Sequence, residues 1–279
     1  MKSKLWIALA LAAWGGTSIQ AQSFLNKLKQ KAESGVVATG FKKSSEPSGW
    51  QKFVGWDVRF EKPHGLEQPV IMDATVAQID GYRFVYLLPF DERTVLVEDT
   101  RYSNSPDIHR SAFETDLANY VKARWPEQSY EILRTEEAAL PIPLVMDVIP
   151  QAFGVAGGFF HPTTGYSFPF AVRVSRKVAE AIKRGESLAD AHARIHFEEC
   201  KNHWYYLALN KMLFLAAEPA ERWRVFARFY GLNQDRIERF YGARMNWTDK
   251  LRLLAGRPPV PVGAAVRALI SAPVRPAWN

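Results

Sequence analysis

Residues 82–102 read YRFVYLLPFDERTVLVEDTRY, two runs of β-forming side chains on either side of a polar turn. The runs at 82–87 and 94–97 are rich in aromatic and β-branched residues, and Asp91-Glu92-Arg93 between them has the length of a hairpin loop. A shorter run at 70–72 precedes them, followed by Asp80-Gly81. This pattern predicts three consecutive strands of an antiparallel meander.

Helix and strand signals follow this meander. Ser111 and Glu114 have the spacing of a capping box, which predicts a helix from Ser111 to about Arg124, just before Pro126. Strand character returns at 130–142. These elements predict a mixed α and β fold with an antiparallel sheet in its first half.

The second half of the chain is predicted to be helical. A glycine-rich turn at 154–165 leads into a helix that ends near Arg184. Ser187 is expected to begin a long helix that runs to about Ala217. Shorter helices follow, separated by one proline and three glycines: Pro219, Gly231, Gly242 and Gly256.

The composition is that of a folded chain with a large core. Of the 279 residues, 47% are hydrophobic and 13% aromatic, which excludes a largely disordered protein and suits a protein that handles a large apolar ligand. Cys200 is the only cysteine, which excludes an internal disulfide, a CxxC redox pair and a cysteine-built zinc site. A lone thiol also fits a reducing compartment.

Positive charge is concentrated at the two ends of the chain. The net charge is +7, and residues 222–279 carry eleven Lys or Arg against three acids. Aromatic residues alternate with the arginines between Arg222 and Arg244. This arrangement fits a pair of amphipathic helices with solvated arginines, an anionic membrane surface, or a nucleic-acid surface. Nucleic acid is the least favoured of the three, and we expect no nucleic-acid partner.

Residues 1–22 have the organisation of a signal-like leader. Two lysines precede an apolar run at residues 5–14, and small and polar residues follow. The run has about ten residues, too few to cross a bilayer, which needs about 20. Residues 23–49 are interpreted as a linker. The leader implies export, which conflicts with the reducing compartment that the single cysteine fits.

Two adjacent acids, Glu98 and Asp99, end the apolar strand at 95–97. Successive strand residues point to opposite faces, so one acid is expected to face inward and the other outward. Burial raises the pKa of an inward carboxyl group, as a general acid at neutral pH requires. The alternative is an acidic strand end that pairs with nearby arginines: Arg83, Arg93 or Arg101.

Two further motifs are candidate binding sites. Residues 157–166 form a dense run of glycine and hydroxyl residues before a helix, which fits a phosphate or flavin site or an ordinary strand-to-helix turn. A stripe of one helix carries three histidines and one acid, but its ends lie about 16 Å apart, too far for one metal ion. We therefore interpret the stripe as a polar helix face and expect no metal: His192, His196, Glu199 and His203.

Four segments, in this order, resemble the bacterial lycopene β-cyclase family. They are MDATVAQ at 72–78, YRFVYLLPF at 82–90, VLVEDTRY at 95–102 and GFFHPTTGYS at 158–167. The tail from about residue 216 to residue 253 is also similar, so the resemblance covers roughly residues 49–262.

The resemblance implies a fold and a cofactor. That family has an FAD-binding fold like the aromatic hydroxylases, with an antiparallel sheet facing the substrate, and uses reduced FAD without net redox change. The chain would be the C-terminal part of this α/β fold, or α+β when taken alone. Its parts would be a substrate domain at 50–150, a flavin-contacting turn and helix at 151–185, and a helical region at 186–279.

The resemblance also implies an activity and its residues. The activity is acid-catalysed cyclisation of the ends of lycopene, a linear carotenoid, to β-ionone rings. Glu98 would be the proton donor or relay, Asp99 would orient it and Asp73 would be a second acid. Aromatic side chains would bind the substrate and stabilise the carbocation: Phe84 and Tyr86, with Tyr166. The flavin would contact Gly157, Gly158, His161, Pro162, Thr163, Thr164, Gly165 and Tyr166.

One family feature is absent from this sequence. The strand-turn-helix unit with its GxGxxG fingerprint, which binds the FAD pyrophosphate, has no counterpart here. Three interpretations follow: a lycopene β-cyclase, or an inactive, N-terminally truncated remnant that binds membrane or carotenoid without catalysis, or a flavin monooxygenase of related fold. The third would also need the missing fingerprint, and the Glu98 motif does not favour it. The basic, aromatic C-terminal helices suit peripheral attachment to the cytoplasmic membrane, which the signal-like leader contradicts.

Overall fold

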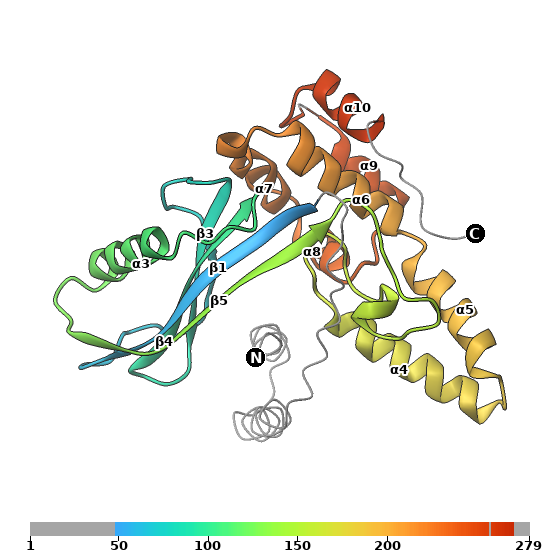
Figure 1. Cartoon of the computed structure of the whole chain (residues 1–279), viewed down its shortest axis with the longest axis horizontal. Coiled ribbons are helices and arrows are strands. Elements are labelled where there is room, and N and C mark those ends of the chain that lie inside the picture. The colour runs from blue at the N-terminus through green and yellow to red at the C-terminus, as the bar shows by residue number, and fades with distance from the viewer. Residues whose placement is uncertain (1–47, 257, 271–279) are drawn as a thin grey trace.

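The structure, a computed structural model, describes residues 48–256 and 258–270 (Figure 1). The leader expected at 1–22 and nearly all of the linker expected at 23–49 lie outside these residues. Five strands form one antiparallel sheet of order β2-β3-β4-β1-β5. The strands are β1 (Ser48–Phe60), β2 (Val70–Asp73), β3 (Tyr82–Pro89), β4 (Thr94–Ser103) and β5 (Tyr130–Pro143).

The predicted meander is confirmed as β2, β3 and β4, and the predicted strand at 130–142 is confirmed as β5. β1 was not predicted, and it lies between the central strand β4 and the edge strand β5. Its sequence includes Lys52, Gly55 and Asp57, which weaken the strand pattern. Lys52 is nevertheless buried, because its Nζ donates to the carbonyl of Asp107 and pairs with Asp80 at 2.7 Å.

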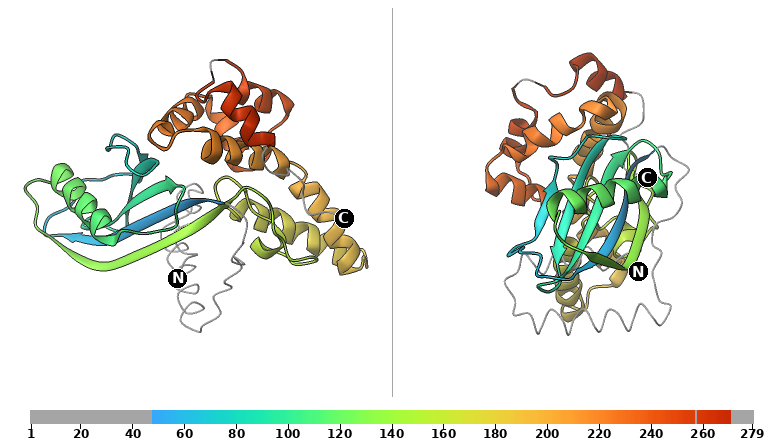
Figure 2. Two further views of the ribbon diagram at one scale, coloured as in Figure 1. Left: turned by 45° about the horizontal axis from the view of Figure 1, so that its top comes forward. Right: turned by 90° about the vertical axis from the view of Figure 1, so that its left-hand side faces the viewer.

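One face of the sheet is covered by α3 (Arg110–Arg124), which crosses it in Figure 2. Phe113, Leu117 and Val121 of this helix pack against buried side chains of β1, β3 and β4. The expected capping box is wrong, because the helix begins at Arg110. Ser111 therefore lies within the first turn, and the N-cap His109 makes no side-chain capping hydrogen bond.

The second half of the chain is helical, as predicted (Figure 1). No helix among residues 48–256 and 258–270 is long and apolar enough to span a membrane. The elements in order are η1 (Val155–Gly157), α4 (Phe168–Lys183), α5 (Leu188–Cys200), α6 (His203–Lys211), η2 (Met212–Ala216), η3 (Pro219–Glu221), α7 (Trp223–Tyr230), α8 (Gln234–Tyr241), α9 (Trp247–Leu254) and α10 (Val262–Ile270).

The long helix expected from Ser187 to Ala217 is interrupted. Ser187 caps α5 as predicted, since its side chain accepts a hydrogen bond from the backbone N–H of Asp190. The helix stops at Cys200, however, and α6 begins at His203. Asn202, at the break, accepts a hydrogen bond from Nζ of Lys250 at 2.8 Å, so the interruption is tied to α9.

Helices after the break cover the second face of the sheet. Phe226 of α7 stacks on Tyr82 of β3, with ring centroids 3.9 Å apart, and Leu213 and Phe214 of η2 join the same core cluster. Arg222 is completely buried and connects the sheet to the helices. Its guanidinium donates to the carbonyl of Tyr102 on β4 and to the carbonyl of Leu213.

Candidate active site

Glu98 lies at the centre of the sheet, on the face that the helices cover. It is directly opposite Tyr86 of β3 on one side and Gly55 of β1 on the other. Its side chain is fully buried, as predicted for an inward-facing acid. Thr100 donates a hydrogen bond to Oε1 of Glu98 at 2.8 Å, and Oε2 has no hydrogen-bond partner among the residues that the structure describes.

These surroundings make Glu98 a weak acid. Burial is the main cause that raises its pKa to about 8; the hydrogen bond from Thr100 opposes the shift, and the nearby charges of Glu136 and Asp99 add to it. The carboxyl group is therefore largely protonated at neutral pH. The expected raised pKa is confirmed.

Asp99 points to the opposite face of β4, as strand alternation predicts. It is not exposed there, so the expectation of an outward-facing acid is wrong: α3 covers the residue and it is fully buried. Its carboxylate accepts hydrogen bonds from Arg83 at 3.0 Å and from Arg101 at 3.0 Å. The structure thus places Asp99 in an ion-pair network behind the sheet, with no hydrogen bond to Glu98.

Asp73 also lies apart from Glu98. Its carboxylate accepts hydrogen bonds from Thr75 and from the hydroxyl of Tyr120 on α3 at 2.7 Å. Burial by itself would raise the pKa of Asp73, but these hydrogen bonds outweigh it and lower the pKa below the usual value. The structure therefore does not bring Asp73 and Glu98 together, and Asp73 is ionised at neutral pH.

The two predicted aromatic residues lie beside Glu98. Phe84 and Tyr86 are buried on the same face of β3, with ring centroids 5.1 Å apart in an edge-to-face arrangement. Tyr86 also lines an apolar cavity of about 280 Å³ between the sheet and the helices. Tyr166, by contrast, is half-buried in the turn before α4 and is not among the residues that line this cavity.

Most of the cavity wall comes from helices. Sequence patterns predicted these helices but did not identify them as the wall of a cavity. The alternation of aromatic residues with arginines in α7 marked these side chains, but it did not show that they face inward. Residues from η2 and from α7 to α10 join Tyr86 and Tyr102 in the wall: Met212, Leu213, Val225, Phe226, Phe229, Tyr230, Phe240, Tyr241, Leu253, Leu254, Val262, Val266 and Leu269.

The glycine-rich turn is held mainly by its own contacts. A Cβ at Gly157 would lie 1.8 Å from the carbonyl oxygen of Ala152, and one at Gly158 would lie 2.8 Å from Val148 in a left-handed backbone conformation. The backbone N–H groups of both glycines donate to carbonyls within the turn, to Gly154 and Val155 respectively. Internal packing thus requires these glycines, whatever the turn binds.

The end of this turn is more open to a ligand. Thr163 and Thr164 line the apolar cavity. Ser167, the N-cap of α4, makes no side-chain capping hydrogen bond, and Pro169 in the first turn has no N–H, which leaves the amides of Phe168 and Phe170 as the donors at this helix end. The residues of this turn fit one edge of a flavin. They do not supply a pyrophosphate site, because the glycine amides are used within the turn.

His161 lies in the interior of the same turn. Its ring is fully buried and contacts the rings of Tyr206, with centroids 4.2 Å apart, and Phe240, with centroids 4.8 Å apart. Burial, reinforced by the nearby His203, lowers the pKa of His161 to about 3. The imidazole is therefore neutral, and it connects the turn to α6 and α8.

The histidine stripe is buried and holds the glycine-rich turn. His192 and His196 form hydrogen bonds through Nε2 with the carbonyls of Ala152 at 2.9 Å and Gly157 at 3.0 Å. Glu199 pairs instead with arginine and lysine side chains. Within the part of the chain that the structure describes, no group of three or more His, Cys, Asp or Glu is arranged to hold a metal ion.

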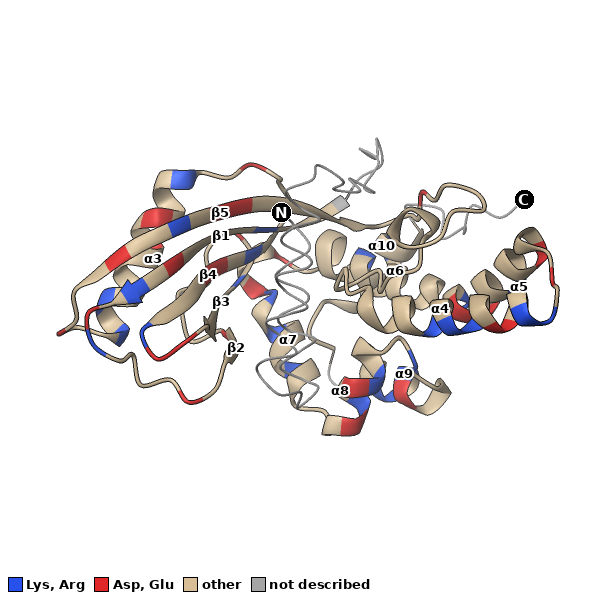
Figure 3. Ribbon diagram, turned by 90° about the horizontal axis from the view of Figure 1, so that it is seen from below, with Lys and Arg blue, Asp and Glu red and all other residues tan. Residues whose placement is uncertain are grey.

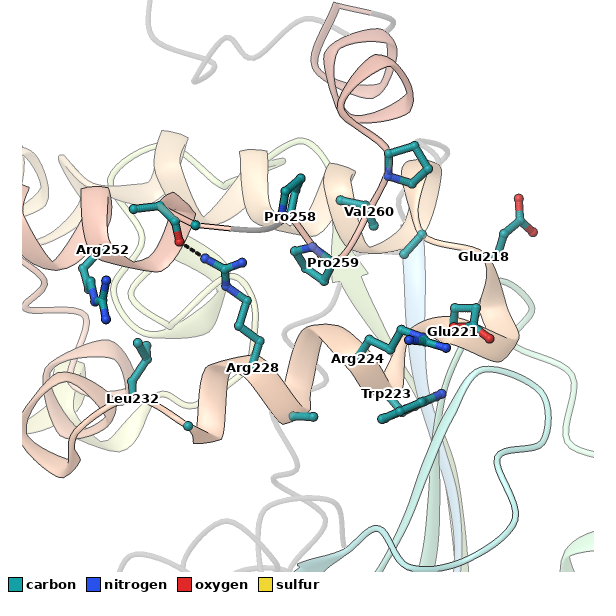
Figure 4. Close-up of a pocket in the computed structure, with 16 residues that line it drawn as sticks. Glu218, Glu221, Trp223, Arg224, Arg228, Leu232, Arg252, Pro258, Pro259 and Val260 are labelled. Carbon is teal, nitrogen blue, oxygen red and sulfur yellow. Dashed lines mark hydrogen bonds and ion pairs between the residues drawn. The ribbon is translucent and has the colours of Figure 1, made fainter.

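The C-terminal arginines are mostly paired rather than freely solvated. Figure 3 shows acids interspersed with the basic residues of α7 to α9, and Asp249 pairs with both Arg236 and Arg239. Next to the apolar cavity, a groove of about 1110 Å³ separates α7 from residues 255–256 and 258–261 (Figure 4). Three basic side chains line this groove: Arg224, Arg228 and Arg252. Arg228 donates a hydrogen bond to the carbonyl of Ala255.

Comparisons with known proteins assign this chain to a family. The profile of the family described as lycopene cyclase protein matches residues 25–267. The lycopene beta-cyclase of Pseudescherichia vulneris is 42% identical over 85% of this chain and 62% of its own length. That of Pantoea ananas is 39% identical over 96% of this chain and 71% of its own length.

A solved structure, a geranylgeranyl bacteriochlorophyll reductase-like protein from Thermoplasma acidophilum, is 11% identical with a TM-score of 0.36, covering 82% of this chain and 56% of that one. This chain spans about two thirds of the length of the two lycopene beta-cyclases described above, 62% and 71%. Its matched segment includes the meander, the glycine-rich turn and the helices of the cavity. The chain belongs to the lycopene cyclase family.

Proposed function

We propose that this protein is a lycopene β-cyclase, which converts the linear ends of lycopene to β-ionone rings. One observation carries the proposal: Glu98, a buried carboxyl group whose pKa is about 8, lies beside Tyr86, which lines an apolar cavity. A hydrocarbon offers no polar group to bind, so an apolar, aromatic wall is the appropriate site for it. A protonated acid beside that wall is the group that an alkene cyclisation requires.

The proposed reaction is an isomerisation in three steps. Glu98 gives its proton to the terminal double bond, which forms a carbocation. The electron pair of the neighbouring alkene then closes the six-membered ring, and the ring cation returns one proton to the Glu98 carboxylate, so no atoms are gained or lost. The ring of Tyr86 stabilises the cation from the cavity wall, and Phe84, which does not line the cavity, packs against Tyr86. Burial keeps water away from the cation.

We propose reduced FAD as the cofactor, on the basis of the family and of the turn before α4. Thr163, Thr164 and the first amides of α4 are the groups of this chain that would hold it. It would supply an electron-rich ring near the cation without net electron transfer. The described residues do not account for its pyrophosphate, so no step of the reaction is assigned to it.

Expression of the chain in a bacterial host that accumulates lycopene tests the proposed activity. We expect monocyclic product or β-carotene in the extracted pigments. The positive control is a lycopene beta-cyclase of known activity expressed in parallel. Unchanged lycopene with folded protein present would contradict the proposal, and would favour a chain that binds carotenoid or membrane without catalysis.

We also propose that the protein attaches peripherally to the cytoplasmic membrane through α9 and α10. Both helices carry strongly exposed apolar side chains: Trp247 is 67% exposed, Leu251 64% and Ile270 78%. On the same two helices, Leu254 and Val262 are exposed and also line the apolar cavity. A mouth that opens on an apolar surface lets a hydrocarbon enter from the bilayer without crossing water.

Vesicle flotation checks this attachment. The triple variant Trp247→Ser, Leu251→Ser and Ile270→Ser is expected to lower binding to anionic phospholipid vesicles by about 10-fold or more, because three large apolar contacts with lipid are lost. The matched control is Ile182→Ser, Leu188→Ser and Phe197→Ser, which removes three exposed apolar side chains from α4 and α5. Equal losses in the two variants would contradict a docking face on α9 and α10.

A further inference from the structure

The row of residues through Glu98 continues across the sheet to a second carboxyl group. Gly55 of β1 is paired with Glu98 of β4 on one side and with Glu136 of β5 on the other, so all three positions share one face. The Cα atoms of the two acids are therefore roughly 10 Å apart, twice the spacing of neighbouring strands.

Gly55 allows the two side chains to approach each other. A Cβ at this position would lie 3.4 Å from Cβ of Glu98 and 3.4 Å from Cγ of Glu136, with Cδ1 of Leu96 at 3.2 Å as the third neighbour. Both acidic side chains thus border the space above the glycine. Any larger residue at position 55 would separate them.

Glu136 is fixed in this position and keeps contact with solvent. Nη1 of Arg134 donates to its Oε2 at 2.8 Å, and the side chain of Glu136 is 17% exposed, whereas Glu98 is fully buried. Arg134 also binds the carboxylate of Asp57, with Nε donating to Oδ2 at 2.6 Å. The row therefore runs from a buried acid at the centre of the sheet to an anchored carboxylate near its edge.

Few charged groups face Glu98 from the elements around it. Tyr86 of β3 and Thr100 of its own strand contribute hydroxyl groups, and burial keeps the pKa of Tyr86 far above its usual value. Asp57 of β1 is bound by Arg134. Asp99 lies behind the strand, where it pairs with Arg83 and Arg101, and its charge also raises the pKa of Glu98. From the helices, the cavity receives the neutral hydroxyls of Tyr230 and Tyr241 and the guanidinium of Arg228.

We propose that Glu136 is a positioning residue for Glu98: its carboxylate, set across Gly55, holds the proton on the buried acid and so keeps the proton donor loaded. The assignment of a donor rests on the proposed function, whereas the interaction between the two acids does not. A negative charge on Glu136, whose Cα atom lies roughly 10 Å from that of Glu98, disfavours a second negative charge on Glu98. Removal of the charge therefore makes Glu98 lose its proton at lower pH.

Infrared titration of the protonated Glu98 carboxyl group tests the proposal on the full chain, without substrate. The band is identified by its loss in Glu98→Gln. In Glu136→Gln we expect the band to disappear about one pH unit lower than in the unsubstituted protein. Glu136→Asp retains the charge, so its band is expected to disappear at nearly the same pH as in the unsubstituted protein. Circular dichroism verifies that each variant is folded, and Glu136→Ala, which also removes the charge, provides a second test if Glu136→Gln is not.

Glu137→Gln is the matched control. Glu137 is the next residue of β5, faces the opposite side of the sheet and is 45% exposed beside Arg110. Its substitution is expected to leave the Glu98 titration unchanged. An unchanged titration in Glu136→Gln, or an equal shift in both variants, would overturn the proposal.

The pH dependence of turnover separates this proposal from the proposed function. If the protein forms cyclised product, the alkaline limb of its rate profile is expected to move in Glu136→Gln by the same amount as the infrared titration. If no product forms but the titration moves, the interaction between the acids stands and the cyclase assignment fails. If product forms and the titration does not move, the cyclase assignment stands and the role of Glu136 fails.

Discussion

Glu98→Gln is expected to slow lycopene cyclisation by about 10²- to 10⁴-fold, the usual contribution of a positioned general acid. Glutamine has nearly the size of glutamate and can still accept the hydrogen bond that Thr100 donates to Oε1, so the fold should persist. It has no acidic proton, so the first step of the reaction is lost. Pigment analysis of the lycopene-accumulating host, at matched protein levels, measures the effect.

Two controls accompany this substitution. Glu137→Gln changes an exposed acid on the other face of the sheet and is expected to retain activity. The same rate in Glu98→Gln as in the unsubstituted protein would remove Glu98 from the mechanism. Turnover of the unsubstituted protein should fall as the pH rises through about 8, because the carboxyl group with that pKa is then ionised.

The same carboxyl group should make folding pH-dependent. Its pKa is about 8 in the folded protein against a usual value of 4.5, so the folded state holds the proton more tightly than the unfolded state. The resulting stabilisation is complete below pH 4.5 and disappears as the pH rises through about 8. Between these two pH values, the free energy of unfolding measured with urea should depend less on pH in Glu98→Gln than in the unsubstituted protein.

Arg222→Ala is expected to lower the free energy of unfolding by about 3 to 5 kcal/mol. The side chain is fully buried at the junction of sheet and helices, and burial lowers its pKa to about 10. Its guanidinium donates to the carbonyls of Leu213 at 3.0 Å and Tyr102 at 2.8 Å, and to the side chain of Asn104 at 2.5 Å. Alanine leaves these acceptors unpaired and opens a cavity.

Arg224→Ala is the matched control for this stability effect. Arg224 lies two residues further on, is 55% exposed and pairs with Glu221 at the surface, so its loss should leave the free energy of unfolding nearly unchanged. Urea denaturation of both variants gives the comparison. Similar stability of Arg222→Ala and Arg224→Ala would show that the buried guanidinium does not hold the sheet to the helices.

Local sequence patterns were enough to find the meander and its acids. β3 and β4 are continuous runs of β-forming residues joined by a short polar turn, and strand alternation alone placed Glu98 and Asp99 on opposite faces. The C-terminal helices and the cap at Ser187 also followed from local signals. The resemblance to lycopene cyclases identified the family, which the comparisons confirm.

The burial of the two acids did not follow from alternation. A strand alternates its faces, but it does not determine what covers each face. α3 covers the face of Asp99, so this acid is buried in an arginine network instead of facing solvent. The break between α5 and α6 was missed for a similar reason, because a contact from distant Lys250 fixes Asn202.

The sequence by itself determined the strands of the meander, the kinds of side chain on each and the family to which the chain belongs. Only the tertiary structure decided that β1 enters between β4 and β5, which places Gly55 between Glu98 and Glu136. It also decided that aromatic residues of α7 and α8 close the cavity beside Tyr86. Periodicity is a local property of the chain, whereas strand order, burial and the walls of a cavity depend on contacts between residues far apart in sequence.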